Sequence, residues 1–286
     1  MPYVDVGKEN SGNVSIYYED HGSGKPVVLI HGYPLNGASW EKQLPALLEA
    51  GYRVISYDRR GFGQSSKPTT GYDYDTFSQD LHRLVGQLDL KEFALVGFSM
   101  GGGEVARYIG NYGTKSVTKA AFLGAIPPYL VKAADNPEGV DKSVFDGIQK
   151  AIAADRYAWF KDFFDNFYNT DKLLGTRISQ QAVQASWNVA VQASPVASYA
   201  CVPTWYTDFR RDLAKVNIPT LVIHGDSDRI VPFSAAGART AKMIPGAKLV
   251  VVKNGPHNIA WTHPDEVNPA LVNFLKEEKK LVPAPA

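Results

Sequence analysis

One serine of the sequence lies in a setting that suits nucleophilic chemistry. Gly97-Phe98-Ser99-Met100-Gly101 fits the pattern G-x-S-x-G, between an apolar run (FALVGF) that predicts a buried strand and a segment (GGGEVARYI) that predicts a helix. Such a turn presents the serine hydroxyl, requires glycine where side chains would collide, and brings the helix N-terminus near developing negative charge. We therefore expect Ser99 to be a nucleophile, with a glycine-rich structural turn as the alternative. A phosphate-binding loop does not fit, because the turn has neither G-x-G-x-x-G nor a G-K-[ST] lysine.

A serine hydroxyl needs a neighbouring base to take its proton, and near neutral pH this base is usually histidine. His257 follows the last predicted strand, in a loop that can reach the carboxyl edge of the sheet, where ligands bind in open α/β sheets. The chain order serine, acid, histidine also fits. We expect His257 to be the base. The other histidines lie in turns, on helices or at strand ends: His21, His31, His82, His224 and His263.

The acid that orients this histidine is expected in the segment HGDSDRIVP, directly after a predicted strand. Asp226 and Asp228 both qualify by position. One of them must accept a hydrogen bond from the imidazole, and the other is then a turn-forming aspartate that binds its own backbone. Spacing alone does not separate the two.

The elements that must position these residues alternate regularly along the chain. Segments typical of strands alternate with segments of helical periodicity. VSIYYED shows an alternating pattern, whereas PVVLIHG is a continuous apolar run typical of a buried parallel strand. The predicted strands are VSIYYED, PVVLIHG, YRVISYD, FALVGF, SVTKAAFLG, IPTLVIHG and AKLVVV, and the predicted helices include those around Leu44, Leu81, Val105 and Leu271. This alternation predicts an α/β fold with a mostly parallel central sheet flanked by helices.

The alternation stops between about residues 126 and 215, where helical patterns are rich in aromatic residues. We interpret residues 126–215 as a helical cap inserted into a core formed by residues 1–125 and 216–277. The last residues, 278–286, are expected to form a disordered tail.

Composition excludes several classes of function. The chain carries 30 Lys and Arg against 29 Asp and Glu, so no basic excess suggests a nucleic-acid or membrane-surface partner. Cys201 is the only cysteine, which rules out an internal disulfide, and we expect it to fill the core. With no apolar run long enough to span a bilayer and no secretory signal visible, we expect a cytoplasmic protein. The sequence has no H-E-x-x-H, cysteine cluster or haem attachment motif, so neither a metal nor a cofactor is expected.

Six motifs together resemble the α/β-hydrolase superfamily over nearly the full chain, and more closely its cofactor-free bacterial haloperoxidases and aryl esterases, the perhydrolase-type branch. They are HGYPLNGASW, YDRRGFGQSS, GFSMGGGEVARY, PTWYTDFRRDL, HGDSDRIVP and GPHNIAWTHPDEVN. The resemblance implies that the acid is Asp228, the second aspartate of HGxxDxxVP. It also implies an oxyanion hole formed by the backbone N–H groups of Met100 and Tyr33. Pro34 cannot donate, so Tyr33 must supply the donor of its loop.

The resemblance further implies acyl transfer from a small ester or carboxylic acid to water or hydrogen peroxide, through an acyl-serine. A peracid made in this way oxidises bromide or chloride in free solution. Members with proline after the oxyanion-loop donor are the perhydrolase-competent ones, so Pro34 is expected to separate peroxide from water as acceptor. Pro34, Phe98, Phe163 and Trp205 are candidate substrate contacts, although cap aromatics such as Phe160 and Phe164 suit a core equally well. The family also suggests a homo-oligomer, a trimer or a hexamer.

Other activities compete with this one. Amidase or lactamase activity stays open, because it uses the same acyl-transfer machinery. A ligand receptor that retains the triad is a weaker alternative. Dehalogenase and epoxide hydrolase chemistry requires an aspartate at the nucleophile position, which Ser99 excludes.

Overall fold

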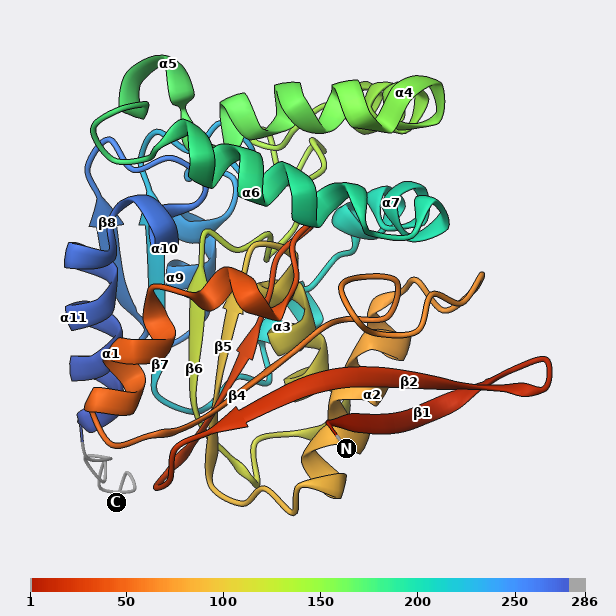
Figure 1. The fold of residues 1–286 in the computed structure, drawn as a ribbon. Coiled ribbons are helices and arrows are strands. Elements are labelled where there is room, and N and C mark those ends of the chain that lie inside the picture. The colour runs from red at the N-terminus through yellow and green to blue at the C-terminus, as the bar shows by residue number, and fades with distance from the viewer. Residues whose placement is uncertain (1, 278–286) are drawn as a thin grey trace.

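Six parallel strands, joined to an antiparallel pair, form the sheet that organises the fold. The computed structural model describes residues 2–277, so the predicted disordered tail lies outside the described residues. The strand order is β1-β2-β4-β3-β5-β6-β7-β8, with β3 to β8 parallel (Figure 1). The strands are β1 (Tyr3–Glu9), β2 (Gly12–His21), β3 (Pro26–Ile30), β4 (Arg53–Tyr57), β5 (Phe93–Phe98), β6 (Val117–Leu123), β7 (Thr220–Gly225) and β8 (Lys248–Val252).

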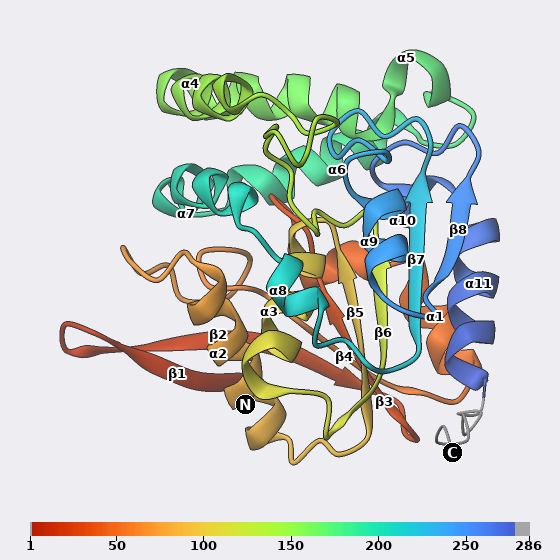
Figure 2. The ribbon, with the colours of Figure 1, turned by 180° about the vertical axis from the view of Figure 1, so that it is seen from behind.

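The inner strands are mainly apolar because helices cover both faces of the sheet. All residues of β5 and β7 are buried, as expected for parallel strands between two helical layers. Helices α1 and α11 lie on one face, and α2, α3, α8 and α9 lie on the other (Figures 1 and 2). These elements are α1 (Gln43–Glu49), α2 (Tyr74–Gln87), α3 (Met100–Tyr112), α8 (Arg210–Leu213), α9 (Gly237–Met243) and α11 (Pro264–Lys276), with a short α10 (Ile259–Thr262) and the 3₁₀ helix η1 (Gly37–Trp40).

A layer of helices between β6 and β7 lies over the carboxyl ends of the strands (Figure 1). It consists of α4 (Lys142–Tyr168), α5 (Thr170–Leu173), α6 (Gln180–Val191), α7 (Pro195–Ala200) and the 3₁₀ helix η2 (Val202–Tyr206). Helix α4 is interrupted at Asp155, whose carboxylate accepts hydrogen bonds from the N–H groups of Tyr157 and Ala158 and so begins the second half of the helix. Helix α8 falls within the predicted cap range but packs against α3. The division at residues 126 and 215 stays a prediction.

The sequence did not predict β1, and it predicted only the middle of β2. In β1 only Val4 and Val6 are buried, so the alternation is too short to stand out. The strand pairs with β2 alone, in an antiparallel hairpin beside the parallel strands. At the other edge of the sheet, Leu249 and Val251 of the predicted β8 are exposed, although their apolar character suggested burial.

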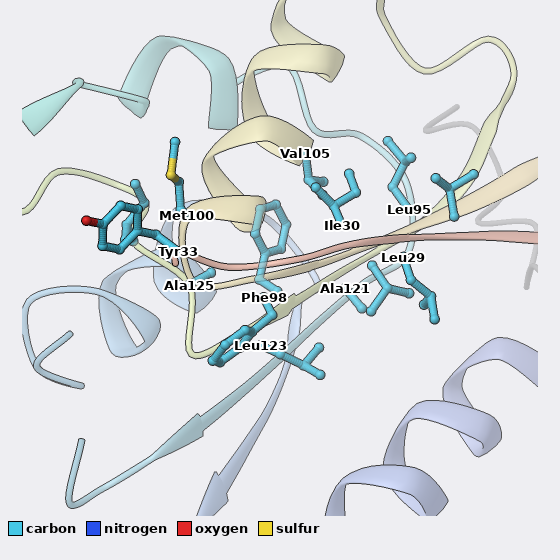
Figure 3. Close-up of a cluster of buried hydrophobic side chains, with 14 of the residues drawn as sticks. Leu29, Ile30, Tyr33, Leu95, Phe98, Met100, Val105, Ala121, Leu123 and Ala125 are labelled. Atoms are coloured by element: carbon cyan, nitrogen blue, oxygen red, sulfur yellow. The ribbon is translucent and has the colours of Figure 1, made fainter. Parts of the chain in front are cut away.

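The first turn of α3 packs unusually close to β3 and β5, and glycines permit this approach. A Cβ atom on Gly97 would lie 2.4 Å from the carbonyl oxygen of Gly101, and a Cβ atom on Gly101 would lie 2.2 Å from the carbonyl oxygen of Ile30. Farther along α3, Val105 points toward Ile30 in the buried cluster of Figure 3. The contact therefore fixes the start of α3 directly over the ends of two strands.

We predict that Gly101→Ala lowers the free energy of unfolding by about 1–3 kcal/mol, the usual range for overpacking, because the added methyl group meets rigid backbone. Gly147→Ala is the matched control. Gly147 lies in α4, and no atom lies within 4 Å of the place that its Cβ atom would take, so alanine there should stabilise by about 0.5–1 kcal/mol. Chemical denaturation of the two variants and the parent protein measures both changes. Equal stability of the two variants would contradict the close contact.

Candidate active site

Ser99 lies at the tip of the turn between β5 and α3, where its backbone is strained. Its φ of 54° and ψ of −120° are values that residues other than glycine rarely adopt. Such strain costs on the order of 1–3 kcal/mol and persists only where the surroundings enforce it. The close contacts at Gly97 and Gly101 do so here. The backbone therefore aims the Ser99 side chain away from the sheet, at the carboxyl ends of the strands.

The structure brings Ser99, His257 and Asp228 together, although they come from three separate loops. The Nε2 atom of His257 lies 2.8 Å from the Oγ atom of Ser99, and its Nδ1 atom lies 2.7 Å from Oδ2 of Asp228. Ser99 follows β5, Asp228 follows β7, and His257 follows β8. Parallel strands place these three loops at one edge of the sheet. The arrangement can move a proton from the serine hydroxyl to an imidazole that a carboxylate holds in place.

Asp226 and Asp228, which the residues alone did not separate, have different surroundings. Asp228 is buried, and its Oδ1 atom accepts hydrogen bonds from the N–H groups of Ile230 and Val231 at 2.9 and 2.8 Å. Burial acts to raise the pKa of the Asp228 carboxyl, but His257 and His224 outweigh it and hold the pKa well below its usual range. Asp226 is exposed and accepts from the N–H of Asn254 at 2.7 Å. Asp226 therefore closes a turn and does not contact His257.

The two predicted oxyanion donors flank the nucleophile. Met100 directly follows Ser99 as the first residue of α3, and Tyr33 follows Gly32, where a Cβ atom would lie 2.9 Å from Cβ of Ser99. Within residues 2–277, neither the N–H of Tyr33 nor that of Met100 donates a hydrogen bond to another protein group. Both donors are therefore free to bind an oxyanion that forms at Ser99.

A cavity of about 160 Å³ adjoins Ser99 and has a mainly apolar wall. It is lined by Tyr33, Ser99, Ile126, Leu130, Val140, Val144, Phe145, Ile148, Phe163, Trp205, Arg229, Ile230, Val231 and Pro232. Among these, Arg229 is the only charged residue, and its guanidinium binds the carboxylate of Asp171 at 2.8 and 3.0 Å. A cavity of this size and character fits a small, uncharged acyl group.

The four candidate substrate contacts fall into two groups. Phe163 and Trp205 line the cavity, whereas Pro34 and Phe98 do not. The Phe98 ring packs instead against His257, with the ring centroids 5.0 Å apart. The cap aromatics Phe160 and Phe164 are fully buried and belong to the core rather than to the cavity wall.

Sequence reasoning missed a buried ionic network beneath the oxyanion loop. The guanidinium of Arg59 binds the carboxylate of Glu104 at 2.8 Å, and both side chains are almost fully buried. The Arg59 guanidinium also donates to the carbonyl oxygen of His31 at 3.0 Å. The backbone N–H of Arg59 donates to Nε2 of the His31 ring at 2.9 Å. Tyr57 donates to the same carboxylate of Glu104. The network links the oxyanion loop to α3, and its only signal in the sequence was charge at positions that otherwise suit apolar residues.

His224 is the second group that sequence reasoning placed without a role. Its ring is fully buried at the end of β7, and Nε2 lies 3.2 Å from Oδ2 of Asp228. The signal that could have revealed it is its position four residues before Asp228, across the same turn.

Among residues 2–277, no group of three or more His, Cys, Asp or Glu side chains is placed to hold a metal ion. Within the same range, no helix is long and apolar enough to cross a membrane. Cys201 is buried, and burial raises the pKa of its thiol to about 12, so the thiolate is disfavoured at neutral pH.

Comparison with known proteins identifies the family of the chain and agrees with its fold. The chain belongs to the alpha/beta hydrolase fold family, whose pattern it matches over residues 25–264. It is 60% identical to a putative non-heme chloroperoxidase of Synechocystis sp., covering 96% of this chain and all of that protein. It is 33% identical to a bifunctional esterase/perhydrolase of Acinetobacter calcoaceticus, covering 92% and 96%. The crystal structure of a bromoperoxidase from Bacillus anthracis superposes with a TM-score of 0.93 at 50% identity, covering 96% and 99%. The expected fold class and family are thereby confirmed.

Substitution of each aspartate in turn tests whether Asp228 or Asp226 is the acid that orients His257. Asp228→Asn should lower kcat for ester hydrolysis by about 10⁴-fold, the size of effect expected when an amide holds the imidazole in the wrong tautomer. Asp226→Asn is the matched control, and it should cost at most a few-fold because Asp226 closes an exposed turn. Steady-state kinetics on a chromogenic acetate ester measures both. If Asp226→Asn were the more damaging change, the acid would have to be reassigned.

Proposed function

We propose that the protein is a serine hydrolase of the esterase and haloperoxidase type, which transfers small acyl groups to water or hydrogen peroxide through an acyl-Ser99 intermediate. The observation that carries the proposal is the continuous hydrogen-bonded chain from Ser99 through His257 to Asp228, beside an apolar cavity. The names of the relatives support it, because they include non-heme chloroperoxidases and a bifunctional esterase/perhydrolase.

In the first half-reaction, Oγ of Ser99 attacks the carbonyl carbon of the ester while Nε2 of His257 takes the hydroxyl proton. The developing oxyanion is bound by the N–H groups of Tyr33 and Met100. Removal of one such donor typically costs on the order of 100- to 1,000-fold in rate. His257 then gives its proton to the leaving alkoxide, the alcohol departs, and the acyl group stays on Ser99.

In the second half-reaction, His257 takes a proton from the acceptor, which attacks the acyl carbon. His257 then returns the proton to Oγ as the bond between the acyl carbon and Ser99 breaks. Water as acceptor gives the carboxylic acid, and hydrogen peroxide gives the peracid. The peracid oxidises bromide or chloride to the hypohalous acid and is itself reduced to the carboxylic acid. Halide oxidation in this scheme occurs after release and uses no second site on the protein.

Asp228 supports both half-reactions without taking the proton. Its carboxylate holds the Nδ1–H tautomer of His257 and stabilises the imidazolium that forms in each transition state. The low pKa that its partners impose keeps this carboxylate ionised throughout the range in which an esterase works.

The wider setting of the enzyme follows from the sequence expectations. We propose that it works in the cytoplasm as a homo-oligomer, a trimer or a hexamer, with residues 126–215 as a cap. Light scattering coupled to gel filtration tests the oligomeric state.

Removal of the nucleophile tests the shared intermediate. Ser99→Ala should abolish ester hydrolysis and bromide oxidation together, because both need the acyl-serine. The two activities are measured on one preparation, with p-nitrophenyl acetate for hydrolysis and with a phenol bromination assay in acetate and hydrogen peroxide. Survival of bromination in the folded variant would require a separate oxidation site and would reject the peracid route.

The choice between water and peroxide is expected to depend on Pro34. The pyrrolidine ring fixes the backbone of residue 34 directly after the oxyanion donor Tyr33, and so fixes where the adjacent carbonyl groups point. A carbonyl group near the attacking atom can accept a hydrogen bond from peroxide that the shorter water molecule does not reach. We predict that Pro34→Leu lowers perhydrolysis of acetate at least several-fold and lowers ester hydrolysis much less. Peracid formation and p-nitrophenyl acetate hydrolysis on the same preparation give the ratio, and an unchanged ratio would leave Pro34 with a purely structural role.

A further inference from the structure

His224 is a buried histidine that contacts the carboxylate of Asp228 from the side opposite the backbone donors. It lies near the end of β7, and its ring has no exposed surface. The Nε2 atom lies 2.9 Å from the carbonyl oxygen of Val231 and 3.2 Å from Oδ2 of Asp228. Asp228 is therefore approached by two imidazole rings, one from β7 and one from the loop after β8.

The positions of its neighbours assign the tautomer of His224. Both oxygens near Nε2 can only accept hydrogen bonds, so Nε2 must carry the proton. Within residues 2–277, the buried Nδ1 atom has no hydrogen-bond partner. Gly237, the first residue of α9, closes that side, because a Cβ atom there would lie 2.5 Å from Nδ1. A second proton on Nδ1 would be buried without an acceptor, which is costly. The geometry therefore assigns the Nε2–H tautomer to His224.

This N–H acts on the end of the carboxylate that the backbone does not hold. Ile230 and Val231 donate to Oδ1, whereas Oδ2 accepts from His257 and from His224. Without His224, Oδ2 would keep only its bond to His257 among the described residues, and that ring is the group the carboxylate has to position. With His224, Oδ2 has a second partner that does not depend on His257, and the Val231 carbonyl is held by the same N–H.

We propose that His224 is a positioning residue, whose Nε2–H holds Oδ2 of Asp228 against Nδ1 of His257. The inference rests on the function proposed above, because it assigns His224 a role in the same proton transfer. His224 is not among the residues that line the cavity and makes no hydrogen bond to Ser99. Its contacts with the site are the carboxylate of Asp228 and the carbonyl oxygen of Val231, a residue of the cavity wall.

Other charged groups near this turn face away from the His224–Asp228 contact. Arg229 binds Asp171, and the carboxylate of Asp226 accepts from Asn254 and Ser227. The elements around the His224 ring contribute Gly237 from α9 and the ring of Phe233, neither of which titrates. Among the described residues, the titratable side chains that contact the Asp228 carboxylate are thus His224 and His257.

Two amide substitutions of His224 test whether the position of its N–H matters or only the presence of a polar side chain. A glutamine places its amide N–H near the position of Nε2, and an asparagine places it near the position of Nδ1. We expect His224→Gln to keep kcat within a few-fold. His224→Asn should lower kcat by about 10- to 100-fold, the order of loss that a misplacement of about 1 Å causes, with KM little changed. Equal activity of the two variants would overturn the proposal. The matched control is His263→Asn, which removes another buried histidine that lies away from the triad and should leave kcat unchanged.

The pH profile distinguishes positioning from a general loss of structure. A carboxylate that turns away from His257 stabilises its imidazolium less, so the acid limb of kcat/KM should move to lower pH in His224→Asn and stay in place in His224→Gln. An unmoved limb in His224→Asn would overturn the proposal. An upward movement would also overturn it, because it would mean that the N–H only withdraws charge from a carboxylate that stays in position.

Two further measurements complete the test. Nitrogen-15 NMR of histidine-labelled, unmutated protein should show His224 as the neutral Nε2–H tautomer; an Nδ1–H tautomer would overturn the proposal even if no variant folded. In a double-variant cycle, His224→Asn should cost little more in the Asp228→Asn background, and full additivity would count against action through Asp228. If Ser99→Ala left ester hydrolysis intact, the proposed function would fail. If Ser99→Ala and Asp228→Asn were both damaging and His224→Asn were not, only the positioning role would fail.

Discussion

The contact between the first turn of α3 and the ends of β3 and β5 is the constraint on which the site depends. Gly97 and Gly101 allow backbone to meet backbone there, and the approach forces Ser99 into its strained turn. The same contact places the N–H of Met100 beside the serine and brings Gly32 against the Ser99 Cβ atom. The packing of α3 on β3 and β5 therefore sets both the position of the Ser99 side chain and the position of the predicted oxyanion donors. The buried pair Arg59 and Glu104 reinforces it, because the pair joins α3 to the chain leading into the oxyanion loop.

A second constraint is the burial of a charged carboxylate. Asp228 lies in the interior, where an ionised group is unfavourable unless it is fully hydrogen-bonded. Four donors meet its two oxygens, two from the backbone and two from imidazole rings. These four hydrogen bonds keep the Asp228 carboxylate ionised and also fix its orientation toward His257. The turn HGDSDRIVP supplies three of the four donors, so this short segment builds most of the acid site by itself.

Much of the fold could be predicted from the sequence, because inner parallel strands are continuous apolar runs. FALVGF and TLVIHG are buried at every position and stood out for that reason. The hairpin strand β1 did not stand out, since only Val4 and Val6 of it reach the core. For the site, strand order placed Ser99 and His257 at one edge, but Asp226 and Asp228 occupy the same turn and differ only in where their side chains point. The family resemblance favoured Asp228, and the structure places that residue beside His257. The contact of His224 with Asp228 depends on how the chain folds back after β7, which the four-residue spacing of the two residues does not specify by itself.

The helices between β6 and β7 contribute more than a wall for the cavity, because they are hydrogen-bonded to the loops that carry Tyr33, Asp228 and His257. The Tyr33 hydroxyl donates to the carbonyl oxygen of Ser198, which ties the oxyanion loop to α7. The Asn169 amide donates to the carbonyl oxygen of Ser227 in the acid loop, and the N–H of Asn258, next to the base, donates to the carbonyl oxygen of Phe167 at the end of α4.

Loops at a sheet edge have few neighbours of their own and are positioned by whatever packs above them. Changes in α4 or α7 that alter the acyl cavity will therefore also move the groups that perform the proton transfers. We therefore expect acyl specificity and rate to be coupled through these three hydrogen bonds and through the aromatic packing of Phe163 and Trp205 against Tyr33. The residues proposed to carry out the reaction belong to loops of the sheet, and the helices between β6 and β7 help to hold those loops in position.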